Sequence, residues 1–207
     1  MPTDIQFGIF QVVVLIFSVV LHELAHGLAA RSMGDDTAER LGRLTLNPLA
    51  HLDPFGSVIL PLLTWYLGGF MFGYAKPVPY DPNKLNDKRW GPAKVGIAGP
   101  ATNIAIALLF SAVLRLSGSL LTPMTAMLVT YIITINLVLA IFNLLPIPPL
   151  DGHWLLFAIL PARSFHLRAM LYRYQWVLLL LALFVIFPLL VPLISALLRL
   201  LTGTTIF

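Results

Sequence analysis

The residues most suited to chemistry form one short stretch, HELAH at positions 22–26. On a helix, residues four apart lie on one face, so His22 and His26 can offer two imidazole nitrogens to a single metal ion. Glu23 is displaced by one residue, close enough to reach a water molecule on that metal without being a ligand. This spacing is the HExxH pattern of zinc-dependent hydrolases.

The setting of this motif is unusual for such a pattern, because it lies in an apolar segment from Ile5 to about Ala30. A lone His on an apolar helix is more often a packed or hydrogen-bonded residue than a ligand. Here two His and one Glu fall within five residues, and a charged residue at the centre of a membrane helix costs about 2.5–3.5 kcal/mol on insertion scales. Such residues are rare in membranes without a partner or a task, so the metal-site interpretation is favoured.

A catalytic zinc site usually has three protein ligands and a water molecule. The chain has no cysteine, so the third ligand must be a His or a carboxylate. Asp151 follows the proline-rich turn at 146–149, where a broken helix lets a side chain turn toward a cavity. We expect Asp151 as the third ligand, with His153 as the lesser candidate. The alternative for Asp151 is an N-cap of the short helix that follows.

The elements that must position these residues are membrane helices. Of the 207 residues, 58% are hydrophobic, and they fall in long blocks, which predicts an all-α, polytopic membrane protein. We expect about four to six membrane segments in a single domain, 1–207, with a catalytic core at about 5–160 and a C-terminal membrane segment at about 174–201. The net charge of +4 is spread over loops and fits a membrane face better than nucleic acid.

Five apolar blocks follow one another along the chain, at about 5–33, 55–72, 95–116, 124–145 and 174–201. Gly34 is expected to cap the first helix at its C-terminus. Residues 40–46 alternate and are compatible with a strand, so we expect a short strand or hairpin arm there. Pro188 and Pro192 interrupt the last block, which leaves open whether it is one kinked span or a hairpin.

Three motifs together resemble one family. HELAH at 22–26, AGPATN at 98–103 and NLLPIPPLDG at 143–152 resemble the site-2 proteases, the intramembrane zinc metalloproteases of peptidase family M50. The loop sequences NPLAHLDPFG at 47–56 and FGYAKPVP at 72–79 are similar to the short bacterial and archaeal members without a PDZ or CBS domain. The resemblance covers most of residues 18–155, and the last block carries no motif that matches.

The resemblance implies one zinc ion per chain, bound by His22, His26 and Asp151, with Glu23 as the catalytic base. The implied function is an endopeptidase that hydrolyses peptide bonds in or near transmembrane segments of membrane proteins, with the lipid bilayer as its surroundings. The alternative is a metal transporter that uses the same His/Asp site. A transporter usually needs several metal-accessible acids along its path, whereas this chain has one cluster. The oligomeric state is not determined.

Further active-centre residues follow from the same resemblance. Asn143 is expected to be a catalytic residue of the active centre, and Asn103 is expected to line the site. Either amide could hold the scissile carbonyl by N–H donation. The alternative for each Asn is hydrogen bonding between helices. The predicted strand offers Leu44, Thr45 and Leu46 as an edge that takes up an extended substrate; the alternative is a strand that only braces the loop.

The depth of the motifs predicts the topology. HELAH lies near the end of the first segment, Asn103 near the start of the third and Asp151 at the end of the fourth, so they meet only if the loops at 34–53, 76–94 and 146–173 share one face. That face carries 11 of the 13 Lys and Arg residues, namely Arg31, Arg40, Arg43, Lys76, Lys84, Lys88, Arg89, Lys94, Arg163, Arg168 and Arg173.

Basic loops mark the cytoplasmic side of a membrane, so we expect a cell-membrane protein with its active site toward the cytoplasm. The block at 55–72 then has cytoplasmic loops at both ends. This predicts a re-entrant element or broken hairpin, bending near Gly68 and Gly69 or at Pro61; the alternative is a plain spanning helix.

Overall fold

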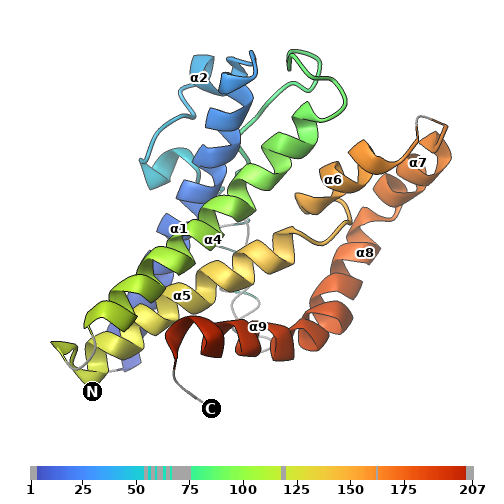
Figure 1. Ribbon diagram of the computed structural model, residues 1–207. Helices are drawn as coiled ribbons and strands as arrows, with labels where there is room; N and C mark the ends of the chain where they lie inside the picture. Colours follow the sequence, from blue (N-terminus) through green and yellow to red (C-terminus); the bar gives the residue numbers. More distant parts are fainter. Residues whose placement is uncertain are drawn as a thin grey trace.

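Helices make up the regular structure of the described part of this chain (Figure 1). The computed structural model describes residues 4–53, 76–117, 120–161 and 163–203, together with residues 56, 59, 63 and 66. The long helices are α1 (Asp4–Ser32), α4 (Gly91–Ser117), α5 (Pro123–Asn143) and α9 (Phe187–Thr202). The shorter helices are α2 (Thr37–Arg40), α6 (Gly152–Ile159), α7 (Phe165–Arg173) and α8 (Gln175–Leu181), with a 3₁₀ turn at Pro48–Ala50.

Four of the described helical segments are long and apolar enough to cross a membrane, at Ile5–Ser32, Gly91–Ser117, Pro123–Asn143 and Gln175–Thr202. They confirm the predicted class, a multi-pass helical membrane protein, at the lower end of the expected number of segments.

The ends of these helices follow from local sequence. The chain leaves α1 through Gly34, which has a φ of 99°, a conformation that glycine adopts without a steric penalty. The Asp35 N–H then bonds to the Ala30 carbonyl at 3.0 Å, which closes the predicted C-terminal cap. At the start of α5, the Thr122 side chain accepts a hydrogen bond from the Thr125 N–H at 3.1 Å, and Pro123 occupies the first helical position.

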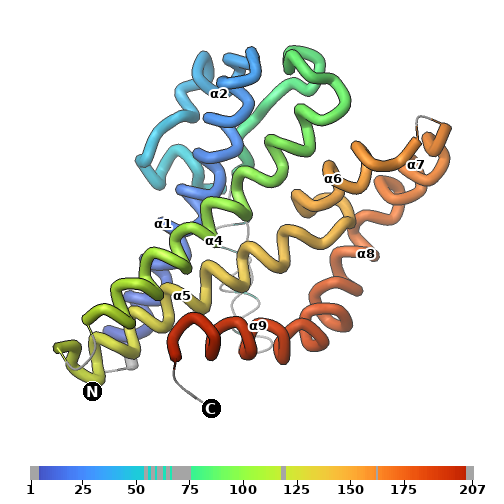
Figure 2. The backbone as a smooth tube through the Cα atoms, viewed as in Figure 1, coloured from blue at the N-terminus to red at the C-terminus, as the bar shows by residue number. Residues whose placement is uncertain are grey.

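The central helix is α4, which packs against both α1 and α5 (Figure 2). A buried apolar cluster joins α4, α5 and α9 and contains Ala107, Val129, Ile133, Leu137 and Leu198. At the other side of the bundle, the Phe7 and Phe10 rings of α1 contact the Tyr131 ring of α5. This packing holds α1, α4 and the end of α5 in register, and these are the elements that carry the three motifs.

The last apolar block is one bent helical segment. A π-helical stretch at Ala182–Ile186 joins α8 to α9, and the two helices point in different directions (Figure 1). Such a stretch is a common cause of a sharp bend. The far end of α9 is tied to α4, because the Ser111 hydroxyl and the Arg115 Nε both donate to the Leu201 carbonyl, at 2.6 and 2.7 Å. The chain therefore continues as a kinked helix through Pro188 and Pro192 and does not turn back as a hairpin.

The predicted strand at 40–46 is wrong, since residues 41–46 form a turn and bends. Gly42 has a φ of 64°, and the Arg43 N–H bonds to the Ala38 carbonyl at 2.9 Å, so the backbone curls back onto α2. The described part of the chain contains no other strand with which this segment could pair. The strand propensity of Leu44, Thr45 and Leu46 is therefore not realised in the described structure. Contact of these residues with a substrate stays a prediction.

The basic loops gather at one end of the bundle, as predicted. The Asn86 N–H donates to the Met33 carbonyl at 2.9 Å, and the Asp81 N–H donates to the Asp35 carboxylate at 2.6 Å. The Arg89 Nε donates to the Ala158 carbonyl at 3.1 Å, which brings the loop after α5 to the same end.

The re-entrant element predicted at 55–72 lies outside the described residues, apart from positions 56, 59, 63 and 66. The residues that flank it are joined, because the Lys76 N–H donates to the His51 carbonyl at 2.9 Å. The two ends of this segment, at His51 and Lys76, thus lie next to each other.

Candidate metal centre

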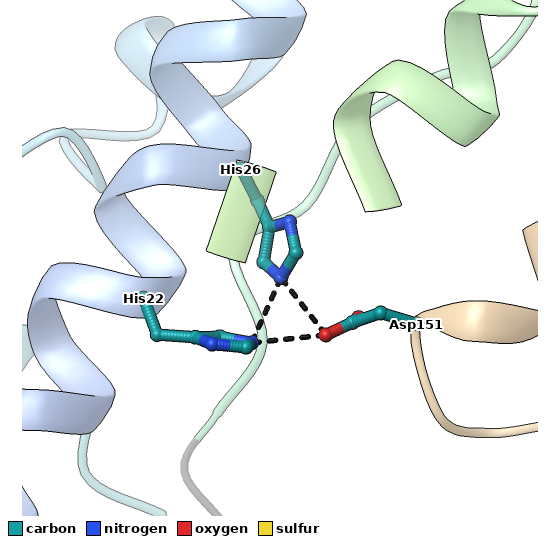
Figure 3. A group of neighbouring side chains, drawn as sticks. All are labelled: His22, His26 and Asp151. Atoms are coloured by element: carbon teal, nitrogen blue, oxygen red, sulfur yellow. Dashed lines mark hydrogen bonds and ion pairs between the residues drawn. The ribbon is translucent and has the colours of Figure 1, made fainter. Parts of the chain in front are cut away.

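Three side chains from distant parts of the sequence converge at one point (Figure 3). The Nε2 atoms of His22 and His26 are 3.0 Å apart. The Asp151 Oδ2 lies 3.0 Å from the His22 Nε2 and 3.4 Å from the His26 Nε2. The structure therefore brings together the predicted trio, in a group that could hold a metal ion.

The elements that position the trio explain this convergence. His22 and His26 are one helical turn apart on α1 and face α4, with 6% and 7% of their surface exposed. Asp151 stands in the turn between α5 and α6 and holds the N-cap position of α6, but its side chain makes no capping hydrogen bond. The carboxylate is thus turned away from the helix end and toward the imidazoles.

The hydrogen bonds behind the two rings decide what the trio can hold. The His26 Nδ1 lies 2.7 Å from the Val95 carbonyl. A carbonyl only accepts, so the proton of the neutral ring belongs on Nδ1, and Nε2 carries a lone pair. The His22 Nδ1 lies 2.5 Å from the Asn103 Oδ1, which assigns the same proton position to that ring.

When both rings are neutral, two lone pairs and a carboxylate oxygen therefore face one another. A cation placed among the three atoms satisfies all of them at once, and His nitrogens with a carboxylate oxygen are a donor set typical of catalytic zinc. The polar groups behind each ring are those that normally orient metal-ligating His. The residues present thus fit a divalent metal ion.

Gly99 makes room for this arrangement on α4. A Cβ atom at position 99 would lie 2.5 Å from the His26 Nε2 and 2.6 Å from the His22 Nε2. Any larger residue would push into the space where the three ligand atoms meet. The glycine of the AGPATN motif is therefore explained by the close approach of α4 to the imidazoles.

A cavity of about 150 Å³ opens beside the trio. Its wall includes Glu23, His26, Tyr80, Asp151 and Trp154, together with Pro77, Val78, Val95, Gly96 and Pro149. The Glu23 Oε2 accepts a hydrogen bond from the Val78 N–H at 2.7 Å. The carboxylate is thus held at the cavity wall, beside the trio and outside it, as the spacing predicts.

Tyr80 is a cavity residue that the sequence did not reveal. Its ring lies edge-on to Trp154 at 5.9 Å, and its hydroxyl is buried without a hydrogen-bond partner among the described residues. Burial raises the pKa of this hydroxyl well above its usual range, so the group keeps its proton. No sequence signal marks it, because a tyrosine in a polar loop is common.

The remaining predicted residues differ in their positions. Asn103 contacts the site through His22. His153, the lesser ligand candidate, bonds instead to the Leu150 carbonyl at 2.6 Å and to the Tyr172 hydroxyl at 3.1 Å. The Asn143 amide donates to the Leu139 carbonyl of its own helix at 2.9 Å, and this residue is not among those that line the cavity. Its catalytic role stays a prediction.

The model of peptidase family M50 matches residues 10–123 and 117–187. Two similar proteins are both named "Putative zinc metalloprotease": YwhC of Bacillus subtilis (strain 168) and Rip2 of Mycobacterium tuberculosis (strain ATCC 25618 / H37Rv). No solved structure matches the chain.

The two relatives differ in how much of their length is matched. YwhC is 40% identical over 159 residues, which is 73% of this chain and 69% of YwhC. Rip2 is 34% identical over 151 residues, which is 70% of this chain and 56% of Rip2.

Proposed function

Since the chain belongs to peptidase family M50, we propose that it is a zinc-dependent intramembrane endopeptidase. Its substrates are other membrane proteins, cleaved in or near their transmembrane segments. The observation that carries this proposal is that Asp151 converges on His22 and His26. These two His and Glu23 lie on a helix apolar enough to cross a membrane.

The proposed zinc site is made of the two His Nε2 atoms and the Asp151 carboxylate, with one ion per chain. A zinc ion held there supplies Lewis acidity, which activates water and polarises a peptide carbonyl. We favour zinc over other divalent ions because imidazole and carboxylate ligands suit it. The names of the two relatives also refer to zinc.

Glu23 is the proposed general base. The Val78 N–H donates to one carboxylate oxygen, which leaves the other oxygen for water in the cavity. Glu23 takes a proton from that water as it attacks the substrate carbonyl and later delivers a proton to the leaving amine. Asn143, an active-centre residue by the family resemblance, is the proposed amide donor to the scissile carbonyl.

The proposed orientation places the site toward the cytoplasm of the cell. The loops that carry most of the Lys and Arg residues meet at the end of the bundle where α1 ends, and basic loops stay on the cytoplasmic side. Water would reach the cavity from that side, while the substrate arrives within the bilayer.

The test is a cleavage assay with the purified full chain, a model transmembrane substrate and three proteins: wild type, Glu23→Gln and Glu39→Gln. Glu39 is exposed on α2 and pairs with Arg31, so it is a matched control. General-base loss should lower the cleavage rate by about 10²–10⁴-fold in Glu23→Gln, with zinc content unchanged, and Glu39→Gln should cleave like the wild type.

Equal cleavage by Glu23→Gln and the wild type would rule out this mechanism. Absence of cleavage in every variant, together with zinc flux across vesicles that contain the protein, would favour the transporter alternative.

A further inference from the structure

A series of buried, hydrogen-bonded polar side chains connects the centre of α5 to the candidate metal centre. Asn136 of α5 and Asn103 of α4 are both 0% exposed, and Ser18 of α1 is 5% exposed. They lie among apolar helices, where each polar group costs free energy unless it is hydrogen-bonded. All three are hydrogen-bonded to one another or to backbone carbonyls, and the last hydrogen bond of the series joins Asn103 to His22.

Asn136, at the far end of this series, sets the direction of its hydrogen bonds. The Asn136 Nδ2 donates to the Ile132 carbonyl at 2.9 Å and to the Ser18 hydroxyl at 3.0 Å. Turning the amide over would place its oxygen against the Ile132 carbonyl, and two acceptors repel. The Asn136 Oδ1 must therefore point the other way, toward Asn103.

Each later link takes its direction from the one before. The Asn103 Nδ2 donates to the Asn136 Oδ1 at 2.8 Å and also approaches the Ser18 carbonyl at 3.4 Å. With its amide nitrogen engaged by two acceptors, Asn103 can present only its oxygen to the His22 Nδ1. The His22 Nδ1 must then be the donor, and the His22 Nε2 is left with its lone pair.

We infer that Asn136 is a positioning residue for the metal centre: acting through Asn103, it keeps the proton of His22 on Nδ1 and so presents Nε2 to the metal ion. The inference rests on the metal site of the proposed function. His26 needs no such relay, because its Nδ1 bonds directly to the Val95 carbonyl.

The inference predicts how the loss of Asn136 acts. In Asn136→Leu the Asn103 amide loses its strongest fixed acceptor and can turn its NH₂ group toward His22. The His22 Nδ1 then becomes an acceptor, the proton moves to Nε2, and a ligand atom is blocked. Mutation of partners behind metal-ligating His typically weakens metal affinity by about 10–100-fold, and we expect a loss in this range.

The experiment measures Zn²⁺ affinity by chelator competition on the purified full chain. The variants are Asn136→Leu, with Asn136→Ser in its place if Leu does not fold, and Thr134→Val as the matched control. Thr134 also lies on α5, and within the described part of the chain it donates only to the Thr130 carbonyl of its own helix, so Thr134→Val should bind Zn²⁺ like the wild type. Nitrogen NMR of the metal-free protein, labelled at His, should show the His22 proton on Nδ1 in the wild type and on Nε2 in the Asn136 variant.

A double variant separates positioning from simple structural support. In Asn103→Asp both side-chain oxygens are acceptors, so either orientation accepts the His22 Nδ1 proton, and Asn136 is no longer needed. Asn103→Asp/Asn136→Leu should therefore recover most of the Zn²⁺ affinity lost in Asn136→Leu. A structural role alone predicts that the double variant loses as much Zn²⁺ affinity as the two single variants, Asn103→Asp and Asn136→Leu, lose together.

The possible failures are distinguishable. A folded wild type that binds no Zn²⁺ would overturn the proposed function and this inference together. A wild type that binds Zn²⁺, with Asn136→Leu equal to it in affinity and His22 proton position, would overturn this inference alone. Additive losses in the double variant would overturn it as well.

Discussion

The Cβ that Gly99 lacks would occupy the space where the three ligand atoms meet. It would lie 2.5 and 2.6 Å from the two imidazole Nε2 atoms, well inside van der Waals contact. Neither ring can retreat easily, because the Nδ1 atom of each ring is bonded to α4, through Val95 or Asn103. Gly99→Ala should therefore separate the ligands and weaken zinc binding. We expect a loss of affinity of at least 10-fold, because mutation of the groups that orient a metal ligand typically costs about 10–100-fold.

Zinc content after purification and competition with a chelator measure this effect. Gly8→Ala is the control, since a Cβ at position 8 meets nothing within 4 Å. Wild-type zinc affinity in a folded Gly99→Ala variant would show that the ligand atoms do not meet where the structure places them.

At the scale of elements, the sequence predicted the long helices well because their signals are local. Apolar blocks longer than 20 residues can only span or be buried, and α1 ends at Gly34 as expected. The ligand trio was also within reach, because His22 and His26 are four residues apart on one helix and the chain offers few other acidic candidates for a third ligand.

The predictions that failed or were missed depend on how elements pack. The strand at 40–46 was favoured by propensity, but a strand needs a neighbour, and the turn at Gly42 removes the segment from pairing. Asn136 was missed because an Asn in an apolar helix does not reveal which neighbour it faces. Glu23 meets Val78 only because the loop before α4 returns to the end of α1, which local sequence does not encode.

At the scale of the whole molecule, the gathered basic loops predict an orientation that can be tested directly. The chain has no native cysteine, so single cysteines can be introduced at Lys88, exposed in the loop before α4, and at Leu120, which is 87% exposed between α4 and α5. A membrane-impermeant thiol reagent should label Lys88→Cys only from the cytoplasmic side and Leu120→Cys only from outside.

The two positions serve as controls for each other, since α4 separates them and they must lie on opposite faces if it spans the membrane. Labelling of Lys88→Cys from outside would reverse the orientation proposed here. It would also place the metal centre toward the external face.

The central claim is that His22, His26 and Asp151 bind one metal ion, and the most direct measurement is metal analysis with X-ray absorption on the purified protein. We expect one zinc per chain, two imidazole nitrogens at about 2.0–2.1 Å and a carboxylate oxygen at about 2.0–2.2 Å, with the metal largely lost in Asp151→Ala. A folded wild type that cannot be loaded with zinc, or an Asp151→Ala variant that keeps the wild-type zinc content and spectrum, would contradict the claim.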